Sequence, residues 1–234
     1  MEETASSIAQ DAIRPPAEAY DLAASHYDAW HWQEFWRRTE TPFFDDCAES
    51  HDFEVRTRML DVGCGTGYYL DRYGLLFRES YGIDPSTGML SEASVRCDEA
   101  HLSVGGLDDL PYSDGAFDLV VCARVLSHVA DLTTALNELV RVVAPGGLLL
   151  ISNIDAGHPY ATTRLPADAG DVYACTYKHS RDDVLKMVVD AGFRISSTMV
   201  ISASGPTSVG HEMFTASLSD PVAWALAATV PARK

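Results

Sequence analysis

Basic residues and long apolar runs are both scarce in this 234-residue sequence. Lys and Arg total 17 against 34 Asp and Glu, which leaves a formal net charge of −17 at pH 7. A surface this acidic repels the phosphates of nucleic acids and of anionic lipids, so we expect no nucleic acid and no membrane among its partners. The longest apolar runs, such as residues 148–151, fall far short of the ~18 residues that a membrane-spanning helix needs.

Cysteine and histidine are too few and too scattered to indicate a disulfide framework or a metal site. The five cysteines are odd in number and include no Cys-x-x-Cys pair, a pattern typical of reduced thiols. The eight histidines include no His-x-x-x-His pair, and we locate no acidic cluster of the kind that binds magnesium, so no metal is expected. The first sixteen residues lack the apolar core of a signal peptide, and we therefore expect a cytoplasmic location.

The chain length favours one large domain rather than two. Hydrophobic residues make up 47% and charged residues 22%, which is typical of a globular protein. We expect residues 1–16 to form a flexible tail, residues 17–50 an aromatic helical lid over the ligand site, and residues 51–234 the main domain. The helical segment is unusually rich in aromatic residues, namely Tyr20, Tyr27, Trp30, Trp32, Phe35, Trp36, Phe43 and Phe44.

From Arg58 onward, short apolar runs alternate with amphipathic stretches. The helical pattern is clearest after Asp131, where apolar residues recur at i, i+3, i+4 and i+7 until Pro145 ends the run. Ser180 and Gly192 mark the start and the end of another helix. This alternation predicts a mostly parallel sheet with helices on both faces. The predicted strands are residues 59–62, 81–83, 102–104, 117–122, 148–152, 193–201 and 222–230.

A glycine-rich run follows the first predicted strand, where α/β sheets bind their ligands. Glycines there let the backbone turn sharply and approach a ligand closely. Asp84 ends the second predicted strand, where its carboxylate could accept hydrogen bonds from both hydroxyls of a ribose. Together they indicate a nucleoside-containing ligand, and the alternative is a glycine-rich turn with a helix-capping acid. The spacing Gly63-x-Gly65-x-Gly67 differs from the dinucleotide pattern G-x-G-x-x-G, which disfavours a nicotinamide dehydrogenase.

This run closely resembles motif I of the class I S-adenosylmethionine-dependent methyltransferases. The likeness continues through residues 82–89, 109–120, 136–152 and 178–193, and it covers roughly residues 55–234. The sequence is most similar to small-molecule enzymes such as the ubiquinone methyltransferases and antibiotic-sugar N-methyltransferases. The resemblance implies S-adenosyl-L-methionine as cofactor and a Rossmann-like doubly wound α/β sheet of seven strands. Their implied order is 3-2-1-4-5-7-6, with strand 7 antiparallel.

The resemblance also implies which residues contact the cofactor. Asp84 matches the ribose-binding acid, and Met89 matches the residue beside the adenine. Many members carry an acid for the adenine amino group where this chain has Gly106, so Asp108 or the backbone of Leu107 would take that role. Residues 20–28 resemble a lid helix whose two tyrosines close over the cofactor and the acceptor, the alternative being an ordinary core helix. The complete set is Tyr20, Asp61, Gly63, Cys64, Gly65, Asp84, Pro85, Met89, Leu107, Asp108 and Ala123.

Methyl transfer from a sulfonium is an in-line displacement on an activated donor, so positioning is the main task of such an enzyme. A general base is needed only if the acceptor arrives protonated. The candidates for catalytic roles are His128, His158 and the lid residue Tyr27. Ordinary packing is the alternative for His128, and an ordinary loop role for His158. Further residues near the same rim are His31, Asn153, Asp155 and Tyr160.

These observations predict methylation of a small molecule, as in secondary metabolism. The eight aromatic residues between positions 20 and 44 favour an apolar or ring-shaped acceptor. The protein is expected to be a monomer or a homodimer. The alternative is a protein that binds S-adenosylmethionine on the same fold without methylating, as a cyclase-like catalyst or a sensor.

Overall fold

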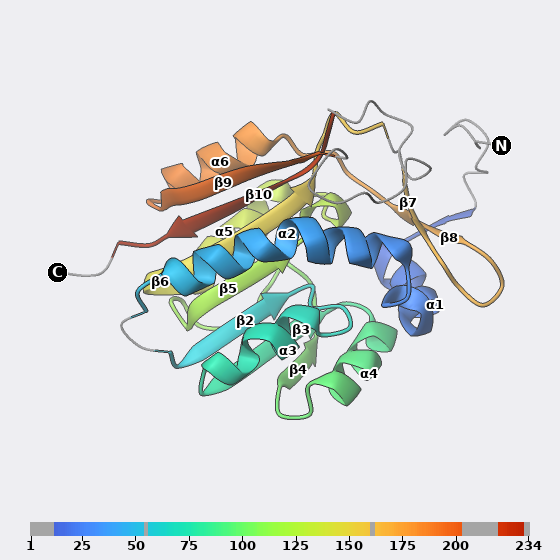
Figure 1. The fold of residues 1–234 in the computed structure, drawn as a ribbon, viewed down its shortest axis with the longest axis horizontal. Coiled ribbons are helices and arrows are strands. Elements are labelled where there is room, and N and C mark those ends of the chain that lie inside the picture. The colour runs from blue at the N-terminus through green and yellow to red at the C-terminus, as the bar shows by residue number, and fades with distance from the viewer. Residues whose placement is uncertain (1–11, 54–55, 160–161, 203–219, 232–234) are drawn as a thin grey trace.

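A seven-stranded sheet forms the centre of the computed structural model, which describes residues 12–53, 56–159, 162–202 and 220–231 (Figure 1). The strand order is β4-β3-β2-β5-β6-β10-β9, and β10 runs antiparallel to both of its neighbours. This confirms the predicted order 3-2-1-4-5-7-6 with strand 7 reversed. The strands are β2 (Arg58–Val62), β3 (Glu79–Asp84), β4 (His101–Val104), β5 (Phe117–Ala123), β6 (Val143–Ile154), β9 (Arg194–Ser202) and β10 (Pro221–Thr229).

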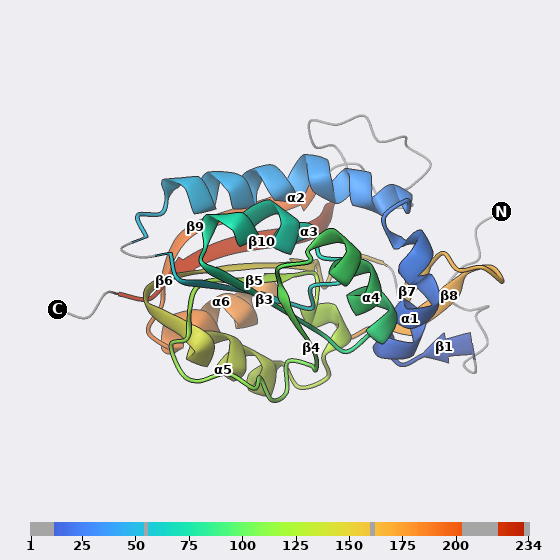
Figure 2. The same cartoon turned by 90° about the horizontal axis from the view of Figure 1, so that it is seen from below.

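Helices cover both faces of the sheet (Figure 2). On one face lie α2 (His31–Ser50), α3 (Tyr68–Tyr73) and α4 (Thr87–Arg96), and on the other lie α5 (Leu132–Val142) and α6 (Arg181–Asp190). The central strands are apolar along their length because both of their faces are buried. The helix start predicted at Asp131 is confirmed, since its carboxylate accepts the N–H groups of Thr133 and Thr134 at 3.0 and 3.1 Å.

The aromatic segment forms two helices with different surroundings. The first, α1 (Pro16–Tyr27), has only Ala19, Ala23 and Ala24 fully buried. In contrast, α2 lies along the sheet and buries Phe35 and Phe44, whose side chains are 1% and 0% exposed. The apolar core therefore includes α2, and we confine the lid hypothesis to α1.

A second, three-stranded sheet was not predicted from the sequence. It contains β1 (Ile13–Arg14), β7 (Thr162–Leu165) and β8 (Val172–Cys175) in the order β1-β8-β7. The tail predicted for residues 1–16 is wrong at its end, because β1 pairs with β8 and α1 begins at Pro16. Leu165 and Ala174 of this sheet pack against α1, so α1 and the small sheet form one layer beside the main sheet.

None of the helices in the described ranges combines the length and the hydropathy that crossing a membrane requires.

Candidate functional site

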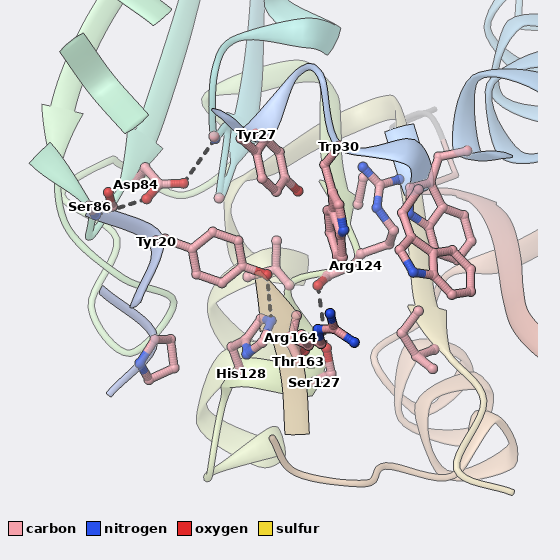
Figure 3. Close-up of a pocket in the computed structure, with 18 of the residues that line it drawn as sticks. Tyr20, Tyr27, Trp30, Asp84, Ser86, Arg124, Ser127, His128, Thr163 and Arg164 are labelled. Atoms are coloured by element: carbon pink, nitrogen blue, oxygen red, sulfur yellow. Dashed lines mark hydrogen bonds between the residues drawn. The ribbon is translucent and has the colours of Figure 1, made fainter. Parts of the chain in front are cut away.

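A pocket lies between the carboxyl ends of the main strands and the layer made by α1 and β7 (Figure 3). The ends of β2, β3 and β5 supply one side of it, and Trp30, Trp32 and Trp36 supply another. Of the predicted site residues, the structure brings nine to this pocket: Tyr20, Tyr27, Gly63, Gly65, Asp84, Pro85, Ala123, His128 and His158. The other five, namely Asp61, Cys64, Met89, Leu107 and Asp108, lie outside its lining.

The glycine-rich loop has a backbone that other residues would not adopt easily. Gly63 and Gly65 have φ angles of +66° and +53°, in the left-handed region that favours glycine. A Cβ atom on Gly63 would lie 2.4 Å from the Val125 side chain. A Cβ atom on Gly65 would meet only the Tyr27 ring, at 3.9 Å. The absence of side chains therefore leaves the loop backbone open to the pocket beneath Tyr27.

Asp84 fixes this loop to the end of β3. One carboxylate oxygen accepts the N–H of Gly65 at 2.9 Å, and the other accepts the N–H of Ser86 at 2.8 Å. Burial raises the pKa of Asp84 to about 6, while these two hydrogen bonds act in the opposite direction. A carboxylate can accept about four hydrogen bonds. Asp84 therefore retains acceptor capacity for the two hydroxyls of a ribose.

Asp61 lies beneath the same loop on β2 and is 2% exposed. Its Oδ2 atom has no hydrogen-bond partner in the described part of the chain. Burial raises the pKa of Asp61 well above its usual value, and the nearby charge of Asp84 adds to this effect. A buried oxygen without a partner costs about 1–3 kcal/mol. A ligand that supplies a hydrogen-bond donor or a positive charge would remove that cost, so this acid fits the amino group of a bound methionine moiety.

An ion pair that the sequence does not predict joins α2 to the end of β5. Arg124 pairs with the fully buried carboxylate of Glu40, which also accepts the hydroxyl of Tyr69 at 2.7 Å. The Arg124 guanidinium lies 5.1 Å from the centre of the Trp36 ring. Arg124 also has φ +62°, which is uncommon outside glycine. This pair sets the position of Trp36 in the pocket wall.

Tyr20 and His128 both line the pocket and form a hydrogen-bonded pair there (Figure 3). The Tyr20 hydroxyl lies 2.9 Å from Nε2 of His128, and Nδ1 of His128 lies 3.1 Å from the carbonyl oxygen of Cys175. Burial lowers the pKa of His128 to about 4, although the bond to Cys175 opposes the shift. His128 is therefore neutral at pH 7.

The remaining candidates have different positions. His158 lines the pocket, and burial, followed by the charge of Lys178, lowers its pKa. Asn153 is fully buried and accepts the N–H of Ser127 at 2.9 Å, so it has a structural role. Asp155 accepts the N–H of Gly157 in a turn at 2.8 Å. Tyr160 lies outside the described residues.

The region predicted to bind the adenine amino group has an unusual arrangement. Met89 and Leu107 are buried, with exposed fractions of 0% and 4%, and Asp108 is exposed. A Cβ atom on Gly106 would lie 2.9 Å from Oδ1 of Asp108. The carboxylate of Asp108 thus lies where a side chain at position 106 would begin.

Comparison with known proteins adds to this geometry. Residues 60–151 match a family model described as a methyltransferase domain. Over 141 residues the chain is 33% identical to a malonyl-[acyl-carrier protein] O-methyltransferase of Serratia marcescens. The matched region covers 60% of this chain and 53% of that protein. Over residues 60–151 the chain is thus similar to methyltransferase domains, as the sequence predicts. The family and the cofactor predicted from the sequence are confirmed.

Two solved structures share the fold of this methyltransferase domain. The DhpI–SAH complex matches with a TM-score of 0.61 and 20% identity, covering 97% of this chain and 100% of that one. The [4+2]-cyclase SpnF matches with a TM-score of 0.58 and 22% identity, covering 82% of each chain. The chain spans about half the length of the curated relative named above.

Proposed function

We propose that this protein transfers a methyl group from S-adenosylmethionine to a small acceptor with an apolar or ring-shaped body. The observation that carries the proposal is a single pocket lined both by the Gly63–Gly65 loop with Asp84 and by Trp30 with Trp32. A ligand with a ribose at one end and a reactive group pointing toward the tryptophans fits this arrangement. Bound S-adenosylmethionine supplies a methyl group on a sulfonium, which is already activated for displacement.

The chain's own residues would hold that cofactor in three places. Asp84 accepts hydrogen bonds from the ribose hydroxyls, and the backbone at Gly63 and Gly65 lies along the methionine portion. Asp61, below the loop, favours the positive charge of the amino group through its unpartnered buried oxygen. Pro85 and Ala123 line the space between these contacts. Cys64 is 6% exposed and supports the loop from below.

Asp108 is our candidate for the acceptor of the adenine amino group. Gly106 leaves the usual place for this acid empty, and the Asp108 carboxylate reaches the same place from two residues further along the chain. Met89 and Leu107 are too deeply buried to offer much surface to a ligand, so we assign them a supporting role beneath the adenine.

Aromatic rings surround the proposed acceptor site. Trp32 and Trp36 are stacked with ring centres 5.6 Å apart, and Trp30 lies 6.5 Å from Trp32. Such walls bind flat apolar groups, and the few polar side chains among them fix the orientation of the ligand. His158 and Arg164 also line the pocket and supply polar atoms to it. An aromatic acceptor, such as an intermediate of secondary metabolism, satisfies this combination.

The helix α1 is our candidate for a lid over the bound cofactor. Asp21 accepts the hydroxyl of Ser86 and the N–H of Gly88, both at 2.7 Å, which holds α1 against the start of α4. Asp28, just after α1, accepts the hydroxyl of Thr66 at 2.9 Å and pairs with Arg96. These bonds hold the proposed lid against the elements next to the cofactor loop. If they break and α1 moves away, both ligands could enter the pocket.

Two measurements test this function. In calorimetry, S-adenosylhomocysteine should bind and NAD should not, and the reverse result would overturn the cofactor assignment. The purified protein should then be incubated with methyl-labelled S-adenosylmethionine and a panel of naphthols, naphthylamines and naphthalenethiols. Mass spectrometry should detect products heavier by one methyl group. Cofactor binding without any methylated product would favour the alternative of a non-methylating protein on this fold.

Light scattering on the same sample distinguishes a monomer from a homodimer.

A further inference from the structure

We propose that Tyr20 and His128 form a proton relay, and that the acceptor is therefore a phenolic hydroxyl that this protein methylates on oxygen. This inference rests on the proposed function and adds the reacting atom of the acceptor and the path of its proton. It starts from the geometry of the pair, in which each partner lines the pocket and the two come from distant elements, α1 and the turn after β5 (Figure 3).

The hydrogen bonds of His128 determine which of its nitrogens carries the proton. The carbonyl oxygen of Cys175 can only accept a hydrogen bond, so Nδ1, at 3.1 Å from it, must be protonated. In a neutral imidazole the other nitrogen, Nε2, then has a free electron pair. The Tyr20 hydroxyl at 2.9 Å must consequently donate its hydrogen to Nε2. A hydroxyl oxygen can also accept a hydrogen bond, and we assign this contact to the hydroxyl of the acceptor.

Ring packing keeps the tyrosine in this orientation. The Tyr20 ring meets the His128 ring edge-on, with centres 5.2 Å apart, and meets the Tyr27 ring in the same way at 5.8 Å. Tyr27 in turn lies over Gly65 of the cofactor loop. The donating hydroxyl is therefore held beside the proposed site of the methyl group, which is where a base is needed.

The proposed reaction is balanced in atoms and charge. The acceptor oxygen forms a bond to the methyl carbon, and the carbon–sulfur bond breaks with its electron pair passing to sulfur. The acceptor proton moves to the Tyr20 oxygen while the Tyr20 proton moves to Nε2 of His128. The products are a methyl ether, a neutral thioether and an imidazolium. The positive charge that leaves sulfur thus reappears on His128, which later releases its proton to water.

The chemistry of the relay selects the acceptor. Tyrosine and other phenols have similar pKa values, about 10, so exchange of a proton between a phenol and Tyr20 is close to thermoneutral. An aliphatic alcohol is a much weaker acid, and an aryl thiol is ionised near neutral pH without help. The aromatic walls also match a phenol. Burial lowers the pKa of His128 to about 4, so the imidazole is neutral at the start of each turnover.

Other titratable groups around the pocket are already engaged or lie on other elements. Both oxygens of Asp84 accept backbone N–H groups, and Arg124 is paired with Glu40. The groups that face the relay are Tyr27 from α1, Cys175 from β8 and Arg164 from β7, with His158 from the loop after β6. The hydrogen bond that His128 makes to another side chain in the described ranges is the one with Tyr20.

A pair of matched acceptors tests the relay, namely 2-naphthol, which needs a base, and 2-naphthalenethiol, which is largely ionised at pH 8. Tyr20→Phe and His128→Gln should each lower kcat for 2-naphthol by about 100-fold or more. For the thiol, kcat should fall less than fivefold, and the Kd for S-adenosylhomocysteine should change less than threefold. Tyr177→Phe, outside the pocket lining, is the control and should leave all three values unchanged. Equal losses with both acceptors would overturn the relay and indicate a purely structural role.

A second measurement needs no acceptor and separates the relay from the proposed function. Histidine labelled with nitrogen-15 should show His128 with Nδ1 protonated and Nε2 unprotonated in the S-adenosylhomocysteine complex, both at pH 7 and at pH 5.5. The His128→Gln variant assigns the signal. An imidazolium, or a proton on Nε2, would overturn the relay even if methyl transfer occurs. If neither acceptor is methylated by the unaltered protein, the relay to a phenol is wrong as stated, whereas cofactor binding alone decides whether the methyltransferase site stands.

Discussion

The two halves of the pocket are shaped in different ways. Beside β2 and β3, hydrogen bonds between the backbone and one carboxylate determine the shape of the pocket. Beside α1 and α2, the packing of aromatic rings determines it. The first half consists of Gly63, Gly65 and Asp84, whose positions follow from strand ends in the main sheet. The second consists mostly of Tyr20, Trp30 and neighbouring rings. We therefore propose that the cofactor is held by few side chains and the acceptor by many.

The two halves also differ in how they are held. Parallel strands in register, such as Asp61 beside Gly82, support the cofactor half from below. The acceptor half depends on α1 packing against the small sheet through Ala19, Ala23, Leu165 and Ala174. Fewer buried contacts support the second half, so we expect it to open more easily.

The largest expected effect comes from filling the glycine-rich loop. Gly65→Val places a β-branched side chain at φ +53° and directs it into the space beneath Tyr27. Binding of S-adenosylhomocysteine should become undetectable by calorimetry. Gly170→Val is the matched control, because Gly170 also has a positive φ, +109°, but has open space around it and lies outside the pocket. If both variants lose the cofactor equally, backbone strain rather than occupied space explains the loss.

The next effect should appear only on the acceptor side. Trp30→Ala removes a ring from the wall without touching the backbone of the cofactor loop. With 2-naphthol, KM should rise by about 30-fold, which corresponds to the roughly 2 kcal/mol typical of a buried aromatic contact. The Kd for S-adenosylhomocysteine should stay within threefold of the original. A large loss of cofactor affinity in this variant would show that the two halves are not separate.

Asp84→Asn should weaken cofactor binding by about 1.5–3 kcal/mol, because it removes an ionised acceptor of hydroxyl hydrogen bonds. The same residue gives binding its pH dependence. Its pKa is raised by burial to about 6, so the carboxylate is ionised above that pH and affinity should fall as the pH drops below it. Calorimetry at pH 5, 6 and 8 should show this trend in the original protein and a flat profile in Asp84→Asn. An equal slope in the variant would assign the titration to another group.

The smallest effect concerns the adenine contact. Asp108→Asn should weaken S-adenosylhomocysteine binding by about 1 kcal/mol, the typical net worth of one hydrogen bond. The double variant Gly106→Asp with Asp108→Gly moves the acid back to the position that related enzymes use and should restore the affinity measured by calorimetry. Unchanged binding in Asp108→Asn would leave the adenine to backbone groups such as those of Leu107.

Candidate residues for the proposed cofactor half could be chosen from the sequence because the signals there are local. Asp61 to Gly67 is one continuous motif, and the order of the seven strands follows from the family that the motif indicates. The acceptor half depends on distant pairs, such as Arg124 with Glu40 or Tyr20 with His128, which are 84 and 108 residues apart. No spacing rule identifies such partners in one sequence.

The second sheet was missed for a related reason. Its strands have two to four residues, too few for a recognisable alternation of apolar and polar positions. They form because α1 covers Leu165 and Ala174, which is a tertiary effect. β6 also begins at Val143, five residues before its predicted start, and its pairing with β5 shifts register between Val143 and Leu148, where Gly146 has φ +78°.

We propose that one pocket binds the cofactor by its backbone half and faces the acceptor with its aromatic half. A crystal structure of the complex with S-adenosylhomocysteine tests it most directly. We predict ribose hydroxyls within hydrogen-bond distance of Asp84, the methionine portion along Gly63 and Gly65, and the sulfur directed toward the space between Tyr20 and Trp30. A ribose bound away from Asp84, or a sulfur that faces away from the aromatic wall, would contradict it.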